Sequence, residues 1–140
     1  MTLATTLIMA VVSASCSNAS PTGPGGSGLT PDHIAGTWTL LTLQPPGQPE
    51  TGPPAGALFT MEMTGGRAAV RADCNQCNGS AAVGATTLTV GPALACTRAF
   101  CASAPFDDTF LRILSGESRA SIDGDVLALR ADRGILRFRR

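Results

Sequence analysis

The sequence is poor in the side chains that most enzymes use to move protons. It has a single histidine, no tyrosine and no lysine, since all ten basic residues are arginines. Histidine is the commonest general acid or base in catalysis, so this inventory argues against an acid–base enzyme. We therefore expect a protein that is not an enzyme and that uses no cofactor.

Charge is also scarce. Only 14% of the residues are charged, and the formal net charge is zero. Binding to nucleic acid phosphates requires a basic excess, so we expect no nucleic-acid partner. Hydrophobic residues reach 44%, too many for a disordered polyampholyte. A chain of 140 residues has room for one domain, which we expect to be a monomer.

The first thirty-one residues carry no charged side chain and fall into two parts. Residues 3–12 are apolar but too few to span a bilayer, and small residues lead from them to Cys16. This pattern resembles a lipoprotein signal, which predicts removal of residues 1–15 and lipidation of Cys16. The alternative is an ordinary secretory signal cut near Ala14. Residues 16–31 are rich in Gly, Pro and Ser and are expected to be a flexible tether.

The remaining residues, 32–140, form the expected folded domain, and their pattern is mostly that of strands. Phe59, Met61 and Met63 alternate with polar residues, as in a half-buried strand. Gly65-Gly66 then predicts a hairpin turn. The Pro-rich segment 44–56 predicts a surface loop. Strands are expected at 37–43, 59–63, 67–73, 79–83, 86–90, 121–122, 126–129 and 135–138.

One segment has helical spacing instead. Phe106, Phe110 and Leu114 fall on one face of a helix over residues 105–114. Pro105 suits its start, and the acidic pair Asp107 and Asp108 suits its first turn. Adjacent residues point in different directions on a helix, so the pair serves the helix dipole better than it would serve as a catalytic carboxylate pair.

Four cysteines lie in the folded part: Cys74, Cys77, Cys96 and Cys101. In an exported domain an even number of cysteines predicts disulfides. The alternatives, in descending order, are a zinc site with four thiolates and a redox pair. Asp73, Asn75 and Asn78 lack the bidentate Glu of a calcium loop, so no metal site is expected. The single histidine, His33, is expected to be solvated.

An ordered set of motifs resembles a META domain of the HslJ heat-shock protein family. The motifs are Gly36-Thr37-Trp38-Thr39-Leu40, Cys74-Asn75 with Gly79, Ala95 to Cys101, the apolar residues of the 106–114 segment, and Gly124 to Phe138. The resemblance covers about residues 34–140. It implies a mainly β, α+β fold: a small antiparallel, barrel-like sheet with one packed helix. It also links the chain to envelope stress responses and to lipoproteins.

The cysteine pairing is expected to be Cys74–Cys101 and Cys77–Cys96. Local pairs within each half would close only tiny loops, which restrain the unfolded chain little. Of the other two pairings, the nested one keeps the sum of paired positions nearly constant, as two antiparallel segments side by side require. The resemblance agrees, because relatives often carry cysteines at the positions of Cys74 and Cys101.

These observations favour a non-catalytic lipoprotein of the bacterial cell envelope. It would be attached to the membrane through lipid on Cys16 and would bind an envelope protein or a small ligand. The alternative is an exported inhibitor of a protease or another hydrolase, because small exported barrels are a common scaffold for inhibitors. Capture of a hydrolase, with loss of its activity, would distinguish the second class from the first.

Overall fold

The structure, a computed structural model, describes residues 28–140. The expected signal peptide (residues 1–15), Cys16 and the tether up to residue 27 lie outside the described residues. The elements, in chain order, are α1 (Pro31–Ile34), β1 (Gly36–Gln44), β2 (Phe59–Thr64), β3 (Arg67–Ala72), β4 (Asn75–Val83), β5 (Thr87–Val90), β6 (Ala95–Cys96), α2 (Phe106–Leu114), β7 (Gly116–Asp123), β8 (Val126–Ala131) and β9 (Gly134–Arg139). No helix in this part of the chain has the length and apolar character to cross a membrane.

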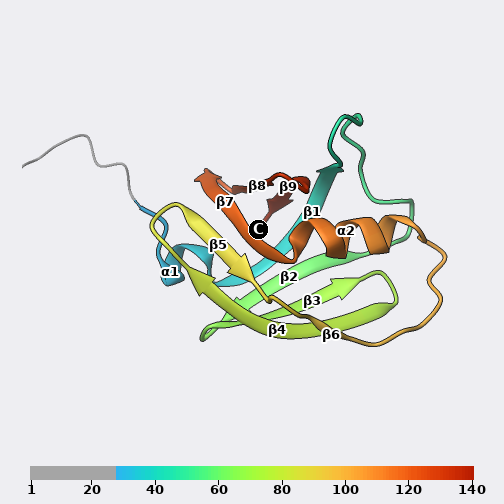
Figure 1. Cartoon of the computed structure of the whole chain (residues 1–140), viewed down its shortest axis with the longest axis horizontal. Helices are drawn as coiled ribbons and strands as arrows, with labels where there is room; N and C mark the ends of the chain where they lie inside the picture. The colour runs from blue at the N-terminus through green and yellow to red at the C-terminus, as the bar shows by residue number, and fades with distance from the viewer. Residues whose placement is uncertain (1–27) are drawn as a thin grey trace, which may run out of the picture.

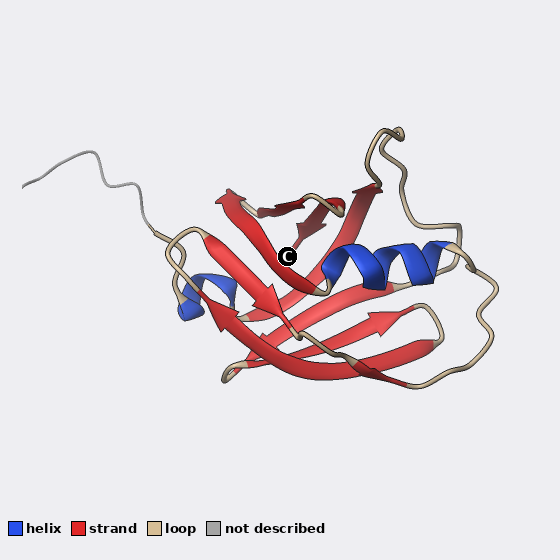
Figure 2. Ribbon diagram, in the orientation of Figure 1, coloured by secondary structure: helices blue, strands red, loops and turns tan. Residues whose placement is uncertain are grey.

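Eight of these strands close into an antiparallel barrel. The hydrogen-bonded order runs β3-β2-β1-β9-β8-β7-β5-β4, and pairing of β3 with β4 completes the ring. The short β6 adds to the edge of β4 beyond the point where β5 ends. Figure 1 shows the curved sheet, with α2 lying across one end of the barrel. The expected fold class, an antiparallel barrel-like sheet with one packed helix, is confirmed (Figure 2).

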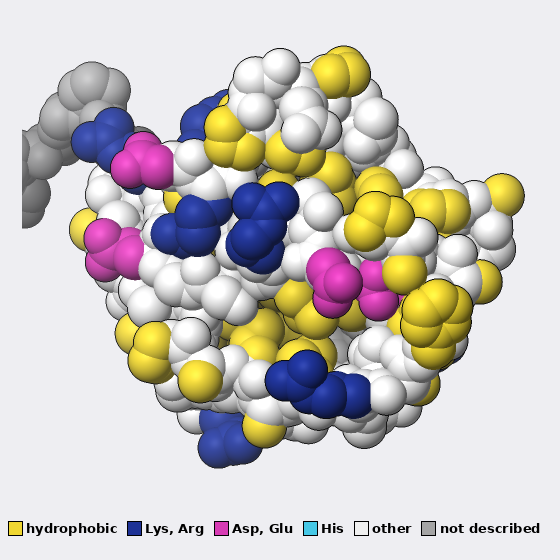
Figure 3. Space-filling view, turned by 45° about the vertical axis from the view of Figure 1, so that its right-hand side comes forward, with side chains coloured by type: hydrophobic (Ala, Val, Ile, Leu, Met, Phe, Trp, Pro, Cys, Tyr) yellow, Lys and Arg dark blue, Asp and Glu magenta, His cyan; other side chains and the backbone are white. Residues whose placement is uncertain are grey.

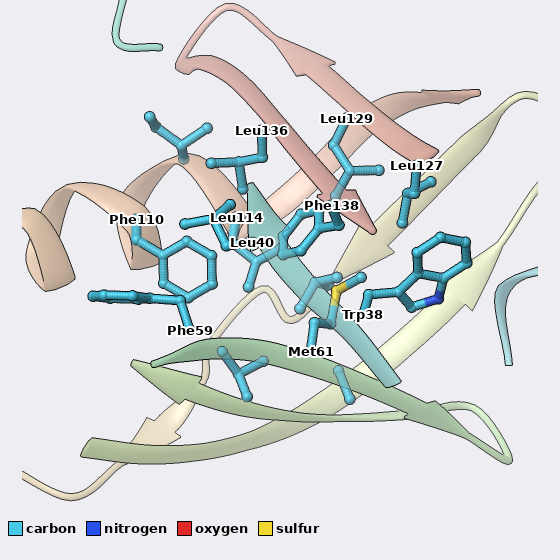
Figure 4. Close-up of a cluster of buried hydrophobic side chains, with 14 of the residues drawn as sticks. Trp38, Leu40, Phe59, Met61, Phe110, Leu114, Leu127, Leu129, Leu136 and Phe138 are labelled. Atoms are coloured by element: carbon cyan, nitrogen blue, oxygen red, sulfur yellow. The ribbon is translucent and has the colours of Figure 1, made fainter. Parts of the chain in front are cut away.

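The barrel interior is the hydrophobic core. Strand alternation places one face of β2 and β3 inside, so Met61 and Val70 are buried whereas Arg67 and Arg71 are exposed. The rings of Phe59 and Phe138 meet that of Phe110 edge-on, at centroid distances of 5.2 and 6.2 Å, and so join α2 to the sheet (Figure 4). The other buried core residues named in Figure 4 are Trp38, Leu40, Leu114, Leu127, Leu129 and Leu136.

Phe106, which the helical spacing assigned to the same core, is only half-buried. Its ring packs edge-on against Phe59 at 5.0 Å. It is the first residue of α2, so no preceding turn of helix covers its outer side. Pro105 is correspondingly the N-cap of α2 rather than its first helical residue.

The folded part begins earlier than residue 32. The amide of Leu29 donates to the carbonyl of Ala85 at 2.7 Å, and the side chain of Leu29 packs against the core. The Thr30 hydroxyl accepts a hydrogen bond from the amide of His33 and so caps α1. Ile34 is buried, and its carbonyl accepts the indole hydrogen bond of Trp38 at 2.8 Å. The last residues of the expected tether are therefore part of the domain.

The strand expected at 79–83 is longer, because β4 begins at Asn75. The sequence predicts one strand that ends at residue 73 and another that begins at residue 79. Instead, Asp73, with a φ of 55°, and Cys74 make a tight turn, after which Asn75 pairs with Ala72. Asn and Gly are depleted in strands, so the sequence around Asn75 gave little strand signal.

The Pro-rich loop after β1 is fastened to the barrel. Leu43 and Thr51 exchange two backbone hydrogen bonds, each of 2.8 Å. The Thr42 hydroxyl donates to the Glu50 carboxylate, and Arg137 of β9 pairs with the same carboxylate at 2.9 Å. The pKa of Glu50 is lowered, chiefly by the Thr42 hydrogen bond; desolvation opposes this, and the hydrogen bond and charge of Arg137 add to the lowering.

Candidate functional site: the 96–101 loop

The four cysteines meet where β4 lies beside the segment that leads to α2. The Sγ atoms of Cys74 and Cys101 are 2.03 Å apart, and those of Cys77 and Cys96 are 2.00 Å apart. This is the nested arrangement expected from the sequence. Elsewhere in the described chain, no three His, Cys, Asp or Glu side chains are placed to hold a metal ion.

Residues 96–101, which we call the 96–101 loop, lie between one cysteine of each bridge. The first part of the loop continues the sheet, because Cys96 pairs with Cys77 in the β6–β4 ladder. The amide of Thr97 then donates to the carbonyl of Gln76, and the Thr97 hydroxyl accepts from the amide of Gln76, each at 2.9 Å. From Thr97 to Cys101 the backbone makes no turn or bend, so the loop is extended.

The side-chain amide of Asn75 holds the middle of this loop. Its Nδ2 donates to the carbonyl of Ala99 at 3.0 Å, and its Oδ1 accepts from the amide of Ala99 at 2.8 Å. The same Oδ1 accepts the Thr97 hydroxyl at 3.1 Å. Asn75 is only 7% exposed, so these hydrogen bonds replace ones to water. The one sequence signal for this role is the place of Asn75 directly after Cys74, in the Cys74-Asn75 motif.

The outer side of the loop presents two large side chains to solvent. Phe100 is 97% exposed, whereas the only other exposed large hydrophobic residue in the described chain, Leu58, is 41% exposed. Arg98 is also exposed and, among the residues that the structure describes, has no ion-pair partner. A rigid backbone therefore carries an apolar ring and a free guanidinium group, separated by Ala99.

A cleft of about 420 Å³ lies between this loop and the start of α2. Its lining includes Asn75, Arg98, Phe100, Asp107, Asp108 and Leu111. Both aspartates lie in the first turn of α2, as expected for residues that complement the helix dipole. Asp107 is 5% exposed, and its Oδ1 has no hydrogen-bond partner. The face that carries α2 shows acidic side chains next to apolar ones (Figure 3).

The other sequence-based candidates lie away from this site. His33 is exposed in α1, as expected, and Arg140 caps it by donating to its carbonyl. Arg140 also stacks over the ring of Trp38 at 4.4 Å. These contacts close the far end of the barrel and bring no further titratable group to the 96–101 loop.

The META domain family model matches residues 31–140. The chain belongs to the META domain family. The match starts at the first residue of α1, in agreement with the structural start of the domain. No curated protein matches this META domain.

Two solved structures share the fold. One is described as the NMR structure of a protein from Burkholderia xenovorans; it has a TM-score of 0.63 and 18% identity, covering 86% of this chain and 97% of that one. The other is also an NMR structure, with a TM-score of 0.62 and 20% identity, covering 79% of this chain and 94% of that one. Similarity at this level of identity establishes the META domain fold alone.

Proposed function

We propose that this META domain is a non-catalytic module that binds a protein partner through the 96–101 loop. The observation that carries the proposal is Phe100, which is almost fully exposed on a backbone held by two disulfides and by Asn75. Aromatic and arginine side chains are the commonest anchors of protein interfaces. On a backbone that is already held in place, the ring of Phe100 is fully available to a partner as an apolar anchor.

The rigidity of the loop favours the same function. Ordering a flexible segment on binding costs free energy, and a segment already fixed in its bound shape avoids that cost. Here the Asn75 hydrogen bonds to Ala99 and Thr97 fix the loop before any partner arrives. The ends are fixed by covalent bonds at Cys96 and Cys101.

The partner-binding role is tested with alanine variants inside the 96–101 loop and outside it. Envelope and secreted proteins would be captured on the purified wild-type domain and on Phe100→Ala and Leu58→Ala. We expect Phe100→Ala to lose the captured partner and Leu58→Ala to keep it, because Leu58 is exposed but lies outside the 96–101 loop. Capture that is equal for wild type, Phe100→Ala and Arg98→Ala would overturn the proposal.

We further propose that the domain is carried as a lipoprotein of the cell envelope. The support is the signal-like sequence before Cys16 and the disulfides, which form in oxidising compartments outside the cytoplasm. The Gly/Pro/Ser-rich residues after Cys16 would hold the domain off the membrane. A role in envelope stress response is consistent with this location.

The anchor is tested by mass spectrometry of the mature N-terminus. We expect the chain to begin at Cys16, and this residue to carry more than one acyl chain, because a single chain anchors a protein only marginally. Cys16→Ser should release the domain from the membrane fraction. A mature chain that begins elsewhere, or an unmodified Cys16, would contradict the lipoprotein assignment.

A further inference from the structure

We infer that the 96–101 loop inhibits a serine endopeptidase that cleaves after arginine, by presenting the Arg98–Ala99 bond to the active site of that enzyme. This inference rests on the proposed function, because it names the class of partner that the same loop binds. The sequence left open an inhibitor of a protease or another hydrolase as the alternative function. The inference narrows this alternative to a protease inhibitor and assigns Arg98 as the residue that enters the specificity pocket.

The shape of the loop matches what an endopeptidase binds. A peptide that pairs with the edge of a protein in extended form offers backbone hydrogen bonds, and its side chains fill pockets that set specificity. Residues 97–101 are extended and contain no turn. The acidic pocket of trypsin-like enzymes accepts a basic side chain. Arg98 is exposed and, within the described residues, unpaired, so no ion pair has to break when it enters such a pocket.

The hydrogen bonds of Asn75 select the Arg98–Ala99 bond as the reactive one. If the serine hydroxyl attacks the Arg98 carbonyl carbon, the bond to the Ala99 nitrogen breaks and the Arg98 acyl group becomes an ester of the serine. The proton of the hydroxyl passes through the enzyme's histidine to the Ala99 nitrogen, which becomes an amine. In an ordinary substrate this amine departs, and water then hydrolyses the ester.

In this domain the new Ala99 amine cannot diffuse away from the enzyme. Asn75 Oδ1 accepts a hydrogen bond from the Ala99 nitrogen at 2.8 Å, and Nδ2 donates to the carbonyl of the same residue. Each side of the Arg98–Ala99 bond is tied to the β3–β4 hairpin by a disulfide, through Cys96 on one side and Cys101 on the other. The amine therefore stays beside the ester and re-forms the peptide bond faster than water displaces it. The enzyme remains occupied instead of turning over.

The neighbouring Phe100–Cys101 bond is a poorer candidate. Cys101 is buried beneath the loop, so an enzyme has no access to the leaving side of that bond. Arg98 and Ala99 are both exposed, so the bond between them is open on each side. Phe100 then lies two residues after Arg98, where its ring adds an apolar contact on the leaving-group side.

The test uses the oxidised, full mature chain against trypsin, with chymotrypsin as the second enzyme and a chromogenic peptide as reporter. We expect competitive inhibition of trypsin. Arg98→Ala should weaken it by on the order of 100-fold or more, whereas Arg98→Lys should restore most of it. Arg98→Phe should transfer inhibition to chymotrypsin, which prefers aromatic side chains. Arg119→Ala, an exposed arginine of β7, is the matched control and should inhibit like wild type.

A second measurement examines the role of Asn75 as a positioning residue. After long incubation, mass mapping of wild type should show one slow cut at Arg98–Ala99. Asn75→Ala should be cut there much faster and should lose inhibition with time. If Asn75→Ala does not fold, Asn75→Asp keeps the acceptor for the Ala99 amide but removes the Nδ2 donor to the Ala99 carbonyl, and it should be cut faster than wild type.

The outcomes separate this inference from the proposed function. Loss of partner capture in Phe100→Ala, together with no inhibition of trypsin by wild type, would leave the binding module standing and overturn the protease inference. Inhibition that is equal in wild type and Arg98→Ala would also overturn it. Partner capture that survives both Phe100→Ala and Arg98→Ala would remove the proposed function and this inference together.

Discussion

Replacing Phe110 with alanine should lower the free energy of unfolding by about 3–5 kcal/mol. Phe110 is the largest buried side chain of α2, and it is 0% exposed. Its ring contacts Phe59 from β2 and Phe138 from β9, the two strands that flank β1 in the barrel wall. Truncation would leave a cavity that the closed sheet cannot fill by collapsing, because its strands are hydrogen-bonded all around the ring.

Urea denaturation followed by circular dichroism measures this loss. Phe106→Ala is the matched control on the same helix, and it should cost less because Phe106 is only half-buried. Phe100→Ala should change stability by less than about 0.5 kcal/mol, since its ring is in solvent. A loss below about 1 kcal/mol for Phe110→Ala would mean that α2 does not pack into the barrel as the structure has it.

The barrel strands could be predicted because their signal is local. In β3, alternate residues from Ala68 to Ala72 are buried, and the small and aliphatic side chains at those positions already alternate with arginines in the sequence. The helix at 106–114 could be predicted for the same reason, from spacing and the turn residues at its ends. Closure of the ring rests on contacts between β1 and β9, which local patterns do not reveal, and here the family resemblance supplied the expectation.

The missed features depend on residues far apart in the chain. Leu41 sits where the pairing of β1 with β9 shifts register, so both Leu40 and Leu43 face the core although they are three residues apart. The side chain of Asn75 is satisfied by the backbone of Ala99, 24 residues further along the chain. The local alternation of residues cannot reveal the β9 strand that pairs with β1 or the loop that binds Asn75.

The two disulfides are expected to be the second large contribution to stability. The bridged cysteines are 27 and 19 residues apart, so each bridge should stabilise the domain by roughly 3 kcal/mol in the chain-entropy model. The paired replacements Cys74→Ala with Cys101→Ala, and Cys77→Ala with Cys96→Ala, should each lower the denaturation midpoint. Peptide mapping without reductant should yield Cys74–Cys101 and Cys77–Cys96 peptides from protein made in an oxidising compartment.

The two double variants should differ in what they do to the 96–101 loop. Removing Cys77–Cys96 leaves the backbone ladder of β6 with β4 and the hydrogen bonds between Thr97 and Gln76 in place, so that end should stay docked. Removing Cys74–Cys101 frees the end that has no ladder, so hydrogen exchange at Ala99 should rise most in that variant. Similar exchange at Ala99 in the two variants would show that Asn75 alone holds the loop. A Cys74–Cys77 peptide, or stoichiometric zinc on four free thiols, would show that the pairing itself is wrong.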